Sequence, residues 1–108
     1  MIRARYIVLT LALALATPLL ADDHEGDAEE GKLVFETKCS VCHNTDSKEK
    51  KIGPGLQGIK DGKLPSGKDT TPENLLENLN KGGGGMPAFE KLITDEEKSD
   101  VIAYVLTL

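Results

Sequence analysis

The apolar residues nearest the C-terminus recur at the spacing of an amphipathic helix, which we expect to run from Thr94 almost to Leu108. Thr94 followed by Glu97 is a capping-box pattern, in which two side chains satisfy the first free backbone N–H groups of a helix. The apolar stripe consists of four residues with two more beside it: Val101, Tyr104, Val105 and Leu108, with Ile102 and Leu106.

A shorter helix is predicted to begin after Thr71. This threonine supplies a side-chain cap, and Pro72 occupies the first helical position, where a missing N–H costs nothing. The glycines at 82–85 would end this helix. Its apolar face would consist of three leucines: Leu75, Leu76 and Leu79.

A third helix is predicted near the N-terminus, over residues 26–39, with apolar residues at Leu33, Val34 and Phe35. Gly31 lies four residues before Phe35, on the same face. A glycine inside a helix costs stability unless another backbone must come close at that point. Gly31 is therefore the residue of this helix that calls for a structural explanation.

Residues 44–71 show no sustained periodicity and are rich in Lys, Gly, Asp and Ser. A loop of this length is uncommon in a compact domain unless it wraps around something or carries function. The chain shows no strand pattern and no internal repeat, so the three helices are the only regular elements that the pattern predicts.

The chain begins with a basic segment and an almost unbroken apolar run from Tyr6 to Ala21, which ends before Asp22. This order is typical of a secretory signal peptide, and we expect cleavage after Ala21. The run of 16 residues is shorter than the roughly 20 that span a membrane, so no stable anchor is expected, a retained signal anchor being the alternative. The expected organisation is a signal peptide over 1–21 and one periplasmic or otherwise extracytoplasmic domain over 22–108.

The net charge becomes more negative when this signal is removed. The full 108 residues carry 18 acidic and 13 basic side chains, a net charge of −5. Both arginines leave with the signal, so the mature chain has 11 lysines, 18 acidic residues and a net charge of −7. This balance argues against nucleic acid as a partner. A domain only slightly longer than about 70–80 residues often needs a disulfide, metal or other staple.

Such a staple is indicated by Cys39-Ser40-Val41-Cys42-His43, which is C-x-x-C-H, the attachment signature of c-type haem. Two intervening residues allow one helical turn to place both thiols beside the two vinyl groups of one macrocycle. The imidazole of His43 could then reach the iron. The motif predicts one covalent haem c, held by Cys39 and Cys42 and ligated by His43.

Three alternatives compete with a haem at this motif. A disulfide between Cys39 and Cys42 would leave His43 unexplained. A thioredoxin-like redox pair needs a βαβ context, and no strand pattern precedes the motif. A structural zinc site needs four ligands, and His24 is the only further His or Cys, without a second paired spacing.

A second iron ligand is predicted at Met86, the only methionine of the mature chain. A lone methionine more often fills a gap in a core. Four glycines at 82–85 and the following Pro87 are a poor core element, however, and suit a loop that lies close to something flat. A thioether opposite His43 would complete six-coordinate iron and raise its potential relative to two histidines.

The chain resembles the class I cytochromes c of the small bacterial and algal monohaem type. The resemblance covers nearly all of residues 26–108 and rests on motifs that follow one another in order: Gly31–Phe35, Cys39–His43, Ile52–Leu56, Met86–Phe89 and Leu92–Val105. It implies an all-α fold in which the N-terminal and C-terminal helices cross and shorter helices and loops wrap around the haem.

The resemblance also implies roles for further residues. Gly31 would be the point of close approach against Val101 and Tyr104. The Pro54 carbonyl would accept a hydrogen bond from the second ring nitrogen of His43 and so orient the imidazole. Four residues would form the apolar wall of the haem: Leu56, Leu75, Leu79 and Phe89.

The chain departs from this family in two respects. Many members bond a haem propionate through Trp, Tyr or Arg, whereas the donors expected in this chain are Lys51, Lys60, Lys68, Gln57 and Asn80. The four glycines before Met86 predict a flexible loop and an iron–sulfur bond that is weaker or exchanges more readily. His24, in an acidic lead-in, is expected to be a solvated residue rather than an alternative ligand.

Charge is unevenly distributed along the mature chain. Residues 22–37 carry a net charge of −6, residues 38–68 a net charge of +4, and residues 69–108 a net charge of −5. The basic middle segment is either an ordinary solvated loop or a surface that steers transient docking of a redox partner.

The function predicted is that of an exported, soluble, monomeric electron carrier rather than an enzyme, with iron cycling between Fe(II) and Fe(III). The partners implied are a membrane cytochrome complex and a terminal oxidase, reductase or photosynthetic centre. The alternatives are a haem enzyme or gas sensor with a labile sixth ligand, and a haem subunit of a larger dehydrogenase.

Overall fold

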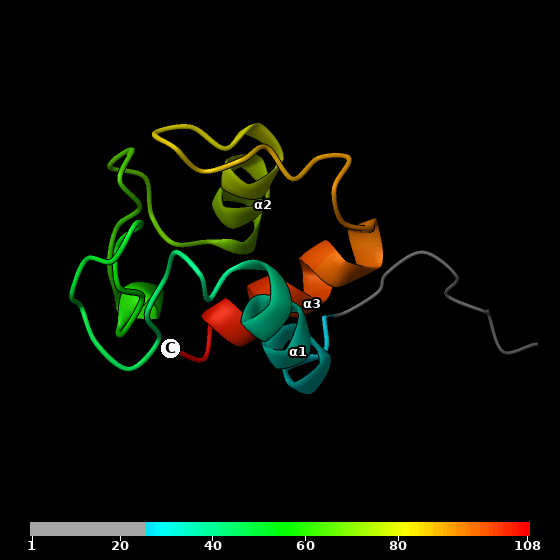
Figure 1. Ribbon diagram of the computed structural model, residues 1–108, viewed down its shortest axis with the longest axis horizontal. Helices are drawn as coiled ribbons and strands as arrows, with labels where there is room; N and C mark the ends of the chain where they lie inside the picture. The colour runs from blue at the N-terminus through cyan, green and yellow to red at the C-terminus, as the bar shows by residue number, and fades with distance from the viewer. Residues whose placement is uncertain (1–25) are drawn as a thin grey trace, which may run out of the picture.

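The structure is a computed structural model, and it describes residues 26–108. The predicted signal peptide and His24 lie outside these residues. Within them are three α-helices and one short 3₁₀ helix: α1 (Ala28–Lys38), η1 (Ile59–Asp61), α2 (Pro72–Lys81) and α3 (Asp95–Val105) (Figure 1). The described part contains no strand, only two isolated bridges, so the all-α prediction is confirmed. No helix in residues 26–108 is long and apolar enough to cross a membrane.

Helix α1 begins two residues later than the predicted boundary because Asp27 caps it. The Asp27 carboxylate accepts hydrogen bonds from the backbone N–H of Glu29 at 2.9 Å and of Glu30 at 3.3 Å. Acidic side chains in this first turn also complement the positive end of the helix dipole. Phe35 is buried, while Leu33 is 57% exposed, so only part of the apolar sequence faces the core.

Helices α1 and α3 cross (Figure 1). The crossing is built around Gly31. A Cβ at this position would overlap the backbone carbonyl of Asp100 and lie 2.9 Å from the Cβ of Tyr104. The predicted approach to Tyr104 is present, but Asp100, rather than Val101, supplies the nearest backbone. One turn further along α1, the rings of Phe35 and Tyr104 meet edge to face, with their centroids 5.5 Å apart.

Helix α2 begins as its sequence predicts, with the Thr71 hydroxyl accepting a hydrogen bond from the Asn74 N–H at 3.2 Å. Leu75 and Leu79 are buried, whereas Leu76 is 39% exposed, so only two of the three leucines on the predicted apolar face enter the core. The apolar face of α2 is therefore narrower than the three leucines suggested.

Helix α3 has the predicted capping box between Thr94 and Glu97, with both reciprocal hydrogen bonds present. The helix ends at Val105, close to the end that the sequence pattern predicts, almost at Leu108. The final carbonyl, of Leu108, accepts a hydrogen bond from the Gly58 N–H at 2.7 Å, which attaches the C-terminus to the long loop.

One apolar core joins the helices to the long loop. It consists of nine buried residues: Phe35, Leu64, Leu75, Leu79, Phe89, Ile93, Val101, Ile102 and Val105. The loop over residues 44–71 supplies Leu64 and includes η1, which the sequence pattern did not predict. In Figure 1 this loop forms the side of the molecule opposite the start of α3.

Candidate haem site

The C-x-x-C-H motif follows directly from the end of α1 and continues as a tight turn. Backbone N–H groups of Cys42 and His43 both donate to the carbonyl of Cys39, at 3.1 and 3.0 Å. Cys39 and Cys42 are free thiols, each partly exposed. One turn of backbone therefore presents two thiols and an imidazole, the three groups that covalent haem attachment requires.

Burial raises the pKa of the Cys39 thiol to about 11, with the nearby Cys42 adding to the shift. Cys39 is therefore protonated at neutral pH. A thioredoxin-like redox pair needs a lowered thiol pKa, because the thiolate is the attacking species. The environment of Cys39 thus disfavours that alternative.

The imidazole of His43 is held by the segment that begins at Gly53. Its Nδ1 lies 2.8 Å from the carbonyl oxygen of Pro54, so the hydrogen bond implied by the family resemblance is present. Because a carbonyl only accepts, Nδ1 carries the proton and Nε2 has the free lone pair. Nε2 has no hydrogen-bond partner within residues 26–108.

Close packing also restricts the orientation of this ring. A Cβ at Gly53 would lie 2.5 Å from Cε1 and 2.9 Å from Nδ1 of His43. The Gly53 N–H donates to the Cys42 carbonyl at 2.7 Å, and the Leu56 N–H donates to the Asn44 carbonyl at 2.8 Å. The segment is thus paired with the motif strongly enough to fix the histidine.

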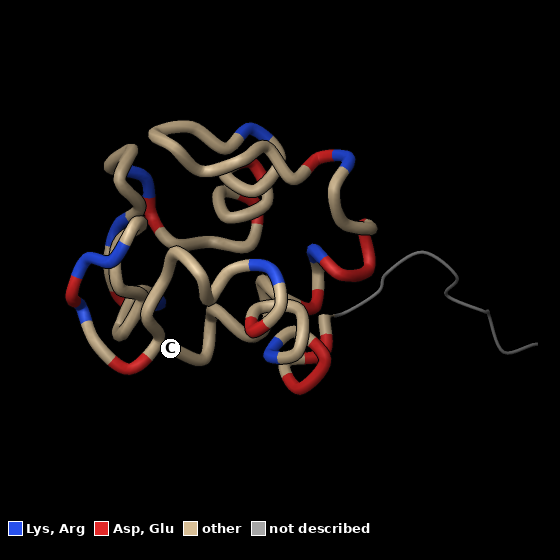
Figure 2. The backbone as a smooth tube through the Cα atoms, in the orientation of Figure 1, with Lys and Arg blue, Asp and Glu red and all other residues tan. Residues whose placement is uncertain are grey.

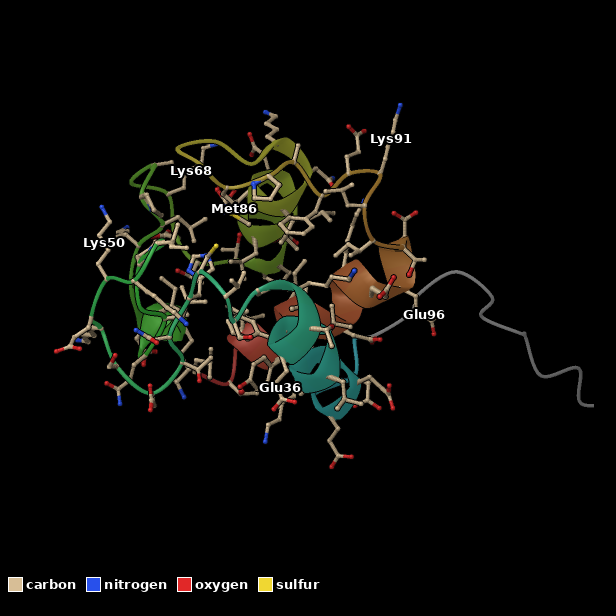
Figure 3. All side chains as sticks on the ribbon, viewed as in Figure 1. Glu36, Lys50, Lys68, Met86, Lys91 and Glu96 are labelled. Atoms are coloured by element: carbon tan, nitrogen blue, oxygen red, sulfur yellow. The ribbon has the colours of Figure 1, made fainter. Side chains whose placement is uncertain are left out.

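Met86 is presented by a tight turn. Gly83 and Met86 exchange backbone hydrogen bonds of 2.9 and 3.0 Å, and both central residues are left-handed, with φ of 61° at Gly84 and 94° at Gly85. This is the backbone of a two-residue hairpin turn, which glycine adopts without a Cβ penalty. In Figure 3, Met86 lies toward the middle of the molecule, whereas Lys50 and Lys91 point outward.

The thioether of Met86 has a contact that the sequence analysis missed. The side-chain amide of Asn78, on α2, lies 3.7 Å from the Met86 sulfur and can donate to it. Asn78 precedes the buried Leu79 and is itself partly buried. The only sequence feature that could have indicated this contact is a polar residue directly before the buried Leu79 of α2.

The four residues of the expected apolar wall lie in or against the buried core. Leu75, Leu79 and Phe89 are members of the buried core, while Leu56 is partly buried and packs against it. Cys39 and Met86 pack against the same core from outside. The structure therefore brings the first thiol, the thioether and all four wall residues to one apolar cluster.

Two of the five expected propionate donors already have hydrogen-bond partners in this structure. The ammonium of Lys51 donates to the Ser40 carbonyl at 3.1 Å, and that of Lys68 to Glu77 at 3.1 Å. Asn80 lines a separate surface pocket of α2. The roles of these residues and of Lys60 and Gln57 stay predictions.

The donor set fits a c-type haem. Two free thiols, a histidine with its second nitrogen already hydrogen-bonded and a thioether beside an apolar core are the groups that such a haem needs. The relevant residues come from the end of α1, the long loop and the 82–94 segment.

Comparisons with known proteins agree with this fit. A family model described as cytochrome c oxidase, cbb3-type, subunit III matches residues 26–105. A cytochrome c type-1 from Ascaris suum is 37% identical over 98 residues, covering 75% of this chain and 88% of the relative. A cytochrome c6 from Rippkaea orientalis is 31% identical over 100 residues, covering 93% of this chain and 84% of the relative.

A solved structure is similar as well. The crystal structure of cytochrome c6 from the diatom Phaeodactylum tricornutum matches with a TM-score of 0.57 at 29% identity, covering 76% of this chain and 93% of that one. The order of the helices, the C-x-x-C-H turn and these likenesses lead to one conclusion. The chain belongs to the cytochrome c family, as a small class I monohaem cytochrome with a covalent haem c.

Proposed function

We propose that this protein is an exported, soluble electron carrier in which His43 and Met86 are the two axial ligands of the haem iron. The observation that carries the proposal is the histidine geometry: Nδ1 donates to the Pro54 carbonyl, which leaves Nε2 free for a metal. A haem with these ligands supplies a one-electron Fe(II)/Fe(III) couple.

In this proposal each site residue has a defined task. Cys39 and Cys42 tether the haem through thioether bonds. Pro54 fixes the tautomer and direction of His43, and Leu56 excludes water from one side. Burial of the cofactor among apolar side chains lowers the local dielectric and so tunes its potential.

Two filled axial positions leave no site for a substrate, so the protein is proposed to be a carrier rather than an enzyme. A haem enzyme or gas sensor would need an open or labile sixth position. Carbon monoxide distinguishes these cases. A carrier with Met86 bound should resist carbon monoxide in the reduced state, and ready binding would favour the sensor.

Visible spectroscopy tests the ligand assignment. Protein matured with haem should show sharp α and Soret bands when reduced and a weak long-wavelength band when oxidised, from charge transfer between methionine and iron. Met86→Ala should lose this weak band and keep the covalent haem. Leu92→Ala, a change of an exposed side chain in the same segment, is the control. A band that survives Met86→Ala would exclude Met86 as the ligand.

A surface for partners is proposed on the basic loop. Figure 2 shows lysines gathered along the loop over 44–71, and acidic residues on α1 and the beginning of α3. Lys48, Lys50 and Lys60 are exposed there, as are the apolar side chains of Val41 and Ile52. An acidic docking site on a membrane cytochrome complex, or on a terminal oxidase, reductase or photosynthetic centre, would complement this surface.

Salt dependence tests this docking. Electron-transfer rates should fall as salt is added, because screening weakens the attraction. Lys50→Glu should lower the rate at low salt, whereas Lys91→Glu, in the segment beyond Met86, should change it less. Rates that ignore ionic strength would overturn the docking proposal.

The name of the matching family model suggests a second candidate, a haem subunit held in a larger complex. Release of the protein as a monomer from the extracytoplasmic fraction would support the shuttle. Purification only with membrane-bound partners would support the subunit. The same fractionation shows whether the chain is cut after Ala21 or keeps its N-terminal segment as an anchor.

A further inference from the structure

Lys98, on α3, is a buried lysine with no role in the haem site described above. Its side chain is 5% exposed, although lysine is among the residues least often buried without a partner. It belongs to the same helix as the buried Val101 and Ile102. A charge in such a position needs a specific partner to offset its loss of hydration.

The partner of Lys98 is a backbone carbonyl. Its ammonium donates to the Glu90 carbonyl oxygen at 2.8 Å and lies 3.3 Å from an Asp95 carboxylate oxygen. The side chain of Asp95 is fully exposed, so water and salt weaken that ion pair. The specific contact is therefore the one with Glu90.

Glu90 lies four residues after Met86, on the segment over 82–94 that joins α2 to α3. The same segment is attached to α2 by the Phe89 N–H, which donates to the Leu79 carbonyl at 2.7 Å. Lys98 attaches it to α3, whose position is set by close packing against α1 at Gly31. The segment that carries Met86 is thus attached by hydrogen bonds to both α2 and α3.

We propose that Lys98 is a positioning residue, whose ammonium fastens the Met86 segment to α3 and so resists displacement of the methionine from the iron. This inference rests on the proposed function of Met86 as a ligand. Loss of the hydrogen bond to the Glu90 carbonyl raises the population of states in which the segment over 82–94 has moved away from α3. Met86 itself is unaltered. Any competing ligand for the iron then binds more tightly, because less free energy is needed for opening.

Removal of the charge should affect local and global stability differently. Lys98→Met keeps most of the side-chain volume and removes the ammonium. Replacing a buried charge by an apolar group of similar shape is often neutral or stabilising for the whole fold. The variant should therefore have a looser Met86 segment and an unchanged or higher free energy of unfolding. A residue with only a structural role would move both quantities in the same direction.

Imidazole binding to the oxidised holoprotein measures the opening, since imidazole must displace Met86. At a fixed neutral pH, Lys98→Met should bind imidazole about tenfold more tightly than wild type. Lys91→Met is the matched control, an exposed lysine in the same segment, and should bind as wild type does. Denaturant unfolding of all three proteins supplies the global measurement.

The outcomes separate the two proposals. If wild type shows the methionine–iron band and Lys98→Met binds imidazole with wild-type affinity, the role of Lys98 is overturned and that of Met86 stands. If tighter binding is accompanied by an equal loss of global stability, Lys98 is merely structural. If wild type has no methionine–iron band, the ligand assignment fails, and the role of Lys98 fails with it.

A measurement that leaves Lys98 in place avoids any folding defect of Lys98→Met. Amine acetylation should modify Lys98 far more slowly than Lys91 in wild type. Met86→Ala removes the proposed bond between the segment over 82–94 and the iron. Because this bond and the contact of Lys98 with Glu90 are coupled reciprocally, acetylation of Lys98 should become severalfold faster. Acetylation of Lys91 should be unchanged. Equal labelling of Lys98 in both proteins would overturn the proposal.

Discussion

At the crossing of α1 and α3, an added methyl group at Gly31 would collide with backbone. The segment over 82–94, which carries Met86, packs Phe89 and Ile93 into the core and is also attached by polar contacts. The crossing buries Phe35 and Val101 to 3% and 2% exposure. Around Met86, three successive glycines, 83–85, have no atom within 4 Å of where a Cβ would stand. Close packing fixes the crossing. The turn before Met86 is open, and hydrogen bonds from the Phe89 N–H and the Lys98 ammonium help to hold the residues after it.

If Met86 is the ligand as proposed, this difference would let the protein hold its haem firmly while the contact between the sulfur and the iron adjusts. A close-packed helix crossing does not deform gradually, so it opens only when the whole domain unfolds, and it therefore sets the global stability. The hydrogen bonds that hold the partly exposed segment over 82–94 can open at a lower free energy than global unfolding requires. Changes at the crossing should therefore affect unfolding, and changes at the site should affect ligand exchange and potential.

The largest effect is expected from Gly31→Val. Its side chain would collide with the Asp100 carbonyl and with Tyr104, and neither can retreat without separating the helices. We expect a loss of about 3 kcal/mol or more in the free energy of unfolding, which denaturant titration would measure. Gly62→Ala is the control, because its added Cβ would have no neighbour closer than 3.6 Å. Equal stability of the two variants would contradict the rigid crossing.

Gly53→Ala should break the site while sparing the crossing. The added methyl group would lie 2.5 Å from the His43 ring and turn it away from the Pro54 carbonyl. Loss of such an outer hydrogen bond typically costs roughly 10–100-fold in metal affinity or activity. We expect a shifted reduction potential and weaker iron–histidine bonding, measured by redox titration. An unchanged potential would show that Pro54 does not control the histidine.

The two regions also differ in how far their sequences predict them. Capping signals at Thr71 and Thr94 are local, so both helix starts were predicted correctly. The C-x-x-C-H spacing is local as well and identified the cofactor. The partial exposure of Leu76 was not predicted because it depends on which elements cover α2, and periodicity alone does not contain that information.

The contacts of Asn78 and Lys98 could not be predicted from the sequence, for a different reason. Each is a polar residue on a helix that also carries buried apolar residues, and polar residues of such helices usually face water. Their partners, a sulfur eight residues away and a backbone carbonyl eight residues away, become visible only when the 82–94 segment folds back. The hydrogen bond from His43 to Pro54 was expected only through the family resemblance.

Asn78→Leu should have a smaller effect, confined to the site. If Met86 ligates the iron as proposed, the amide 3.7 Å from its sulfur would donate to one lone pair and leave the other for the metal. Without it, we expect imidazole to bind about two- to threefold more tightly, since the lost contact is a weak hydrogen bond. Leu76→Ala, which changes a 39% exposed side chain on the same helix, is the control. Equal affinities would show that the amide does not orient the sulfur.

The smallest effect is expected at Glu77, whose carboxylate accepts from Lys81 at 2.7 Å and from Lys68 at 3.1 Å, joining the long loop to α2. These hydrogen bonds lower the pKa of Glu77 below its ordinary value of 4.5. A lowered pKa in the folded state stabilises the fold above the unfolded-state pKa, and this contribution disappears as the pH falls through the folded-state value.

Glu77→Gln should therefore be slightly less stable than wild type at pH 7, and the two should converge in acid, as denaturant midpoints would measure. Salt should shrink the difference at pH 7, because both lysines are exposed. Glu73→Gln serves as the control on the same helix, and a difference that grew toward acid would place the origin of the effect elsewhere than in these two ion pairs.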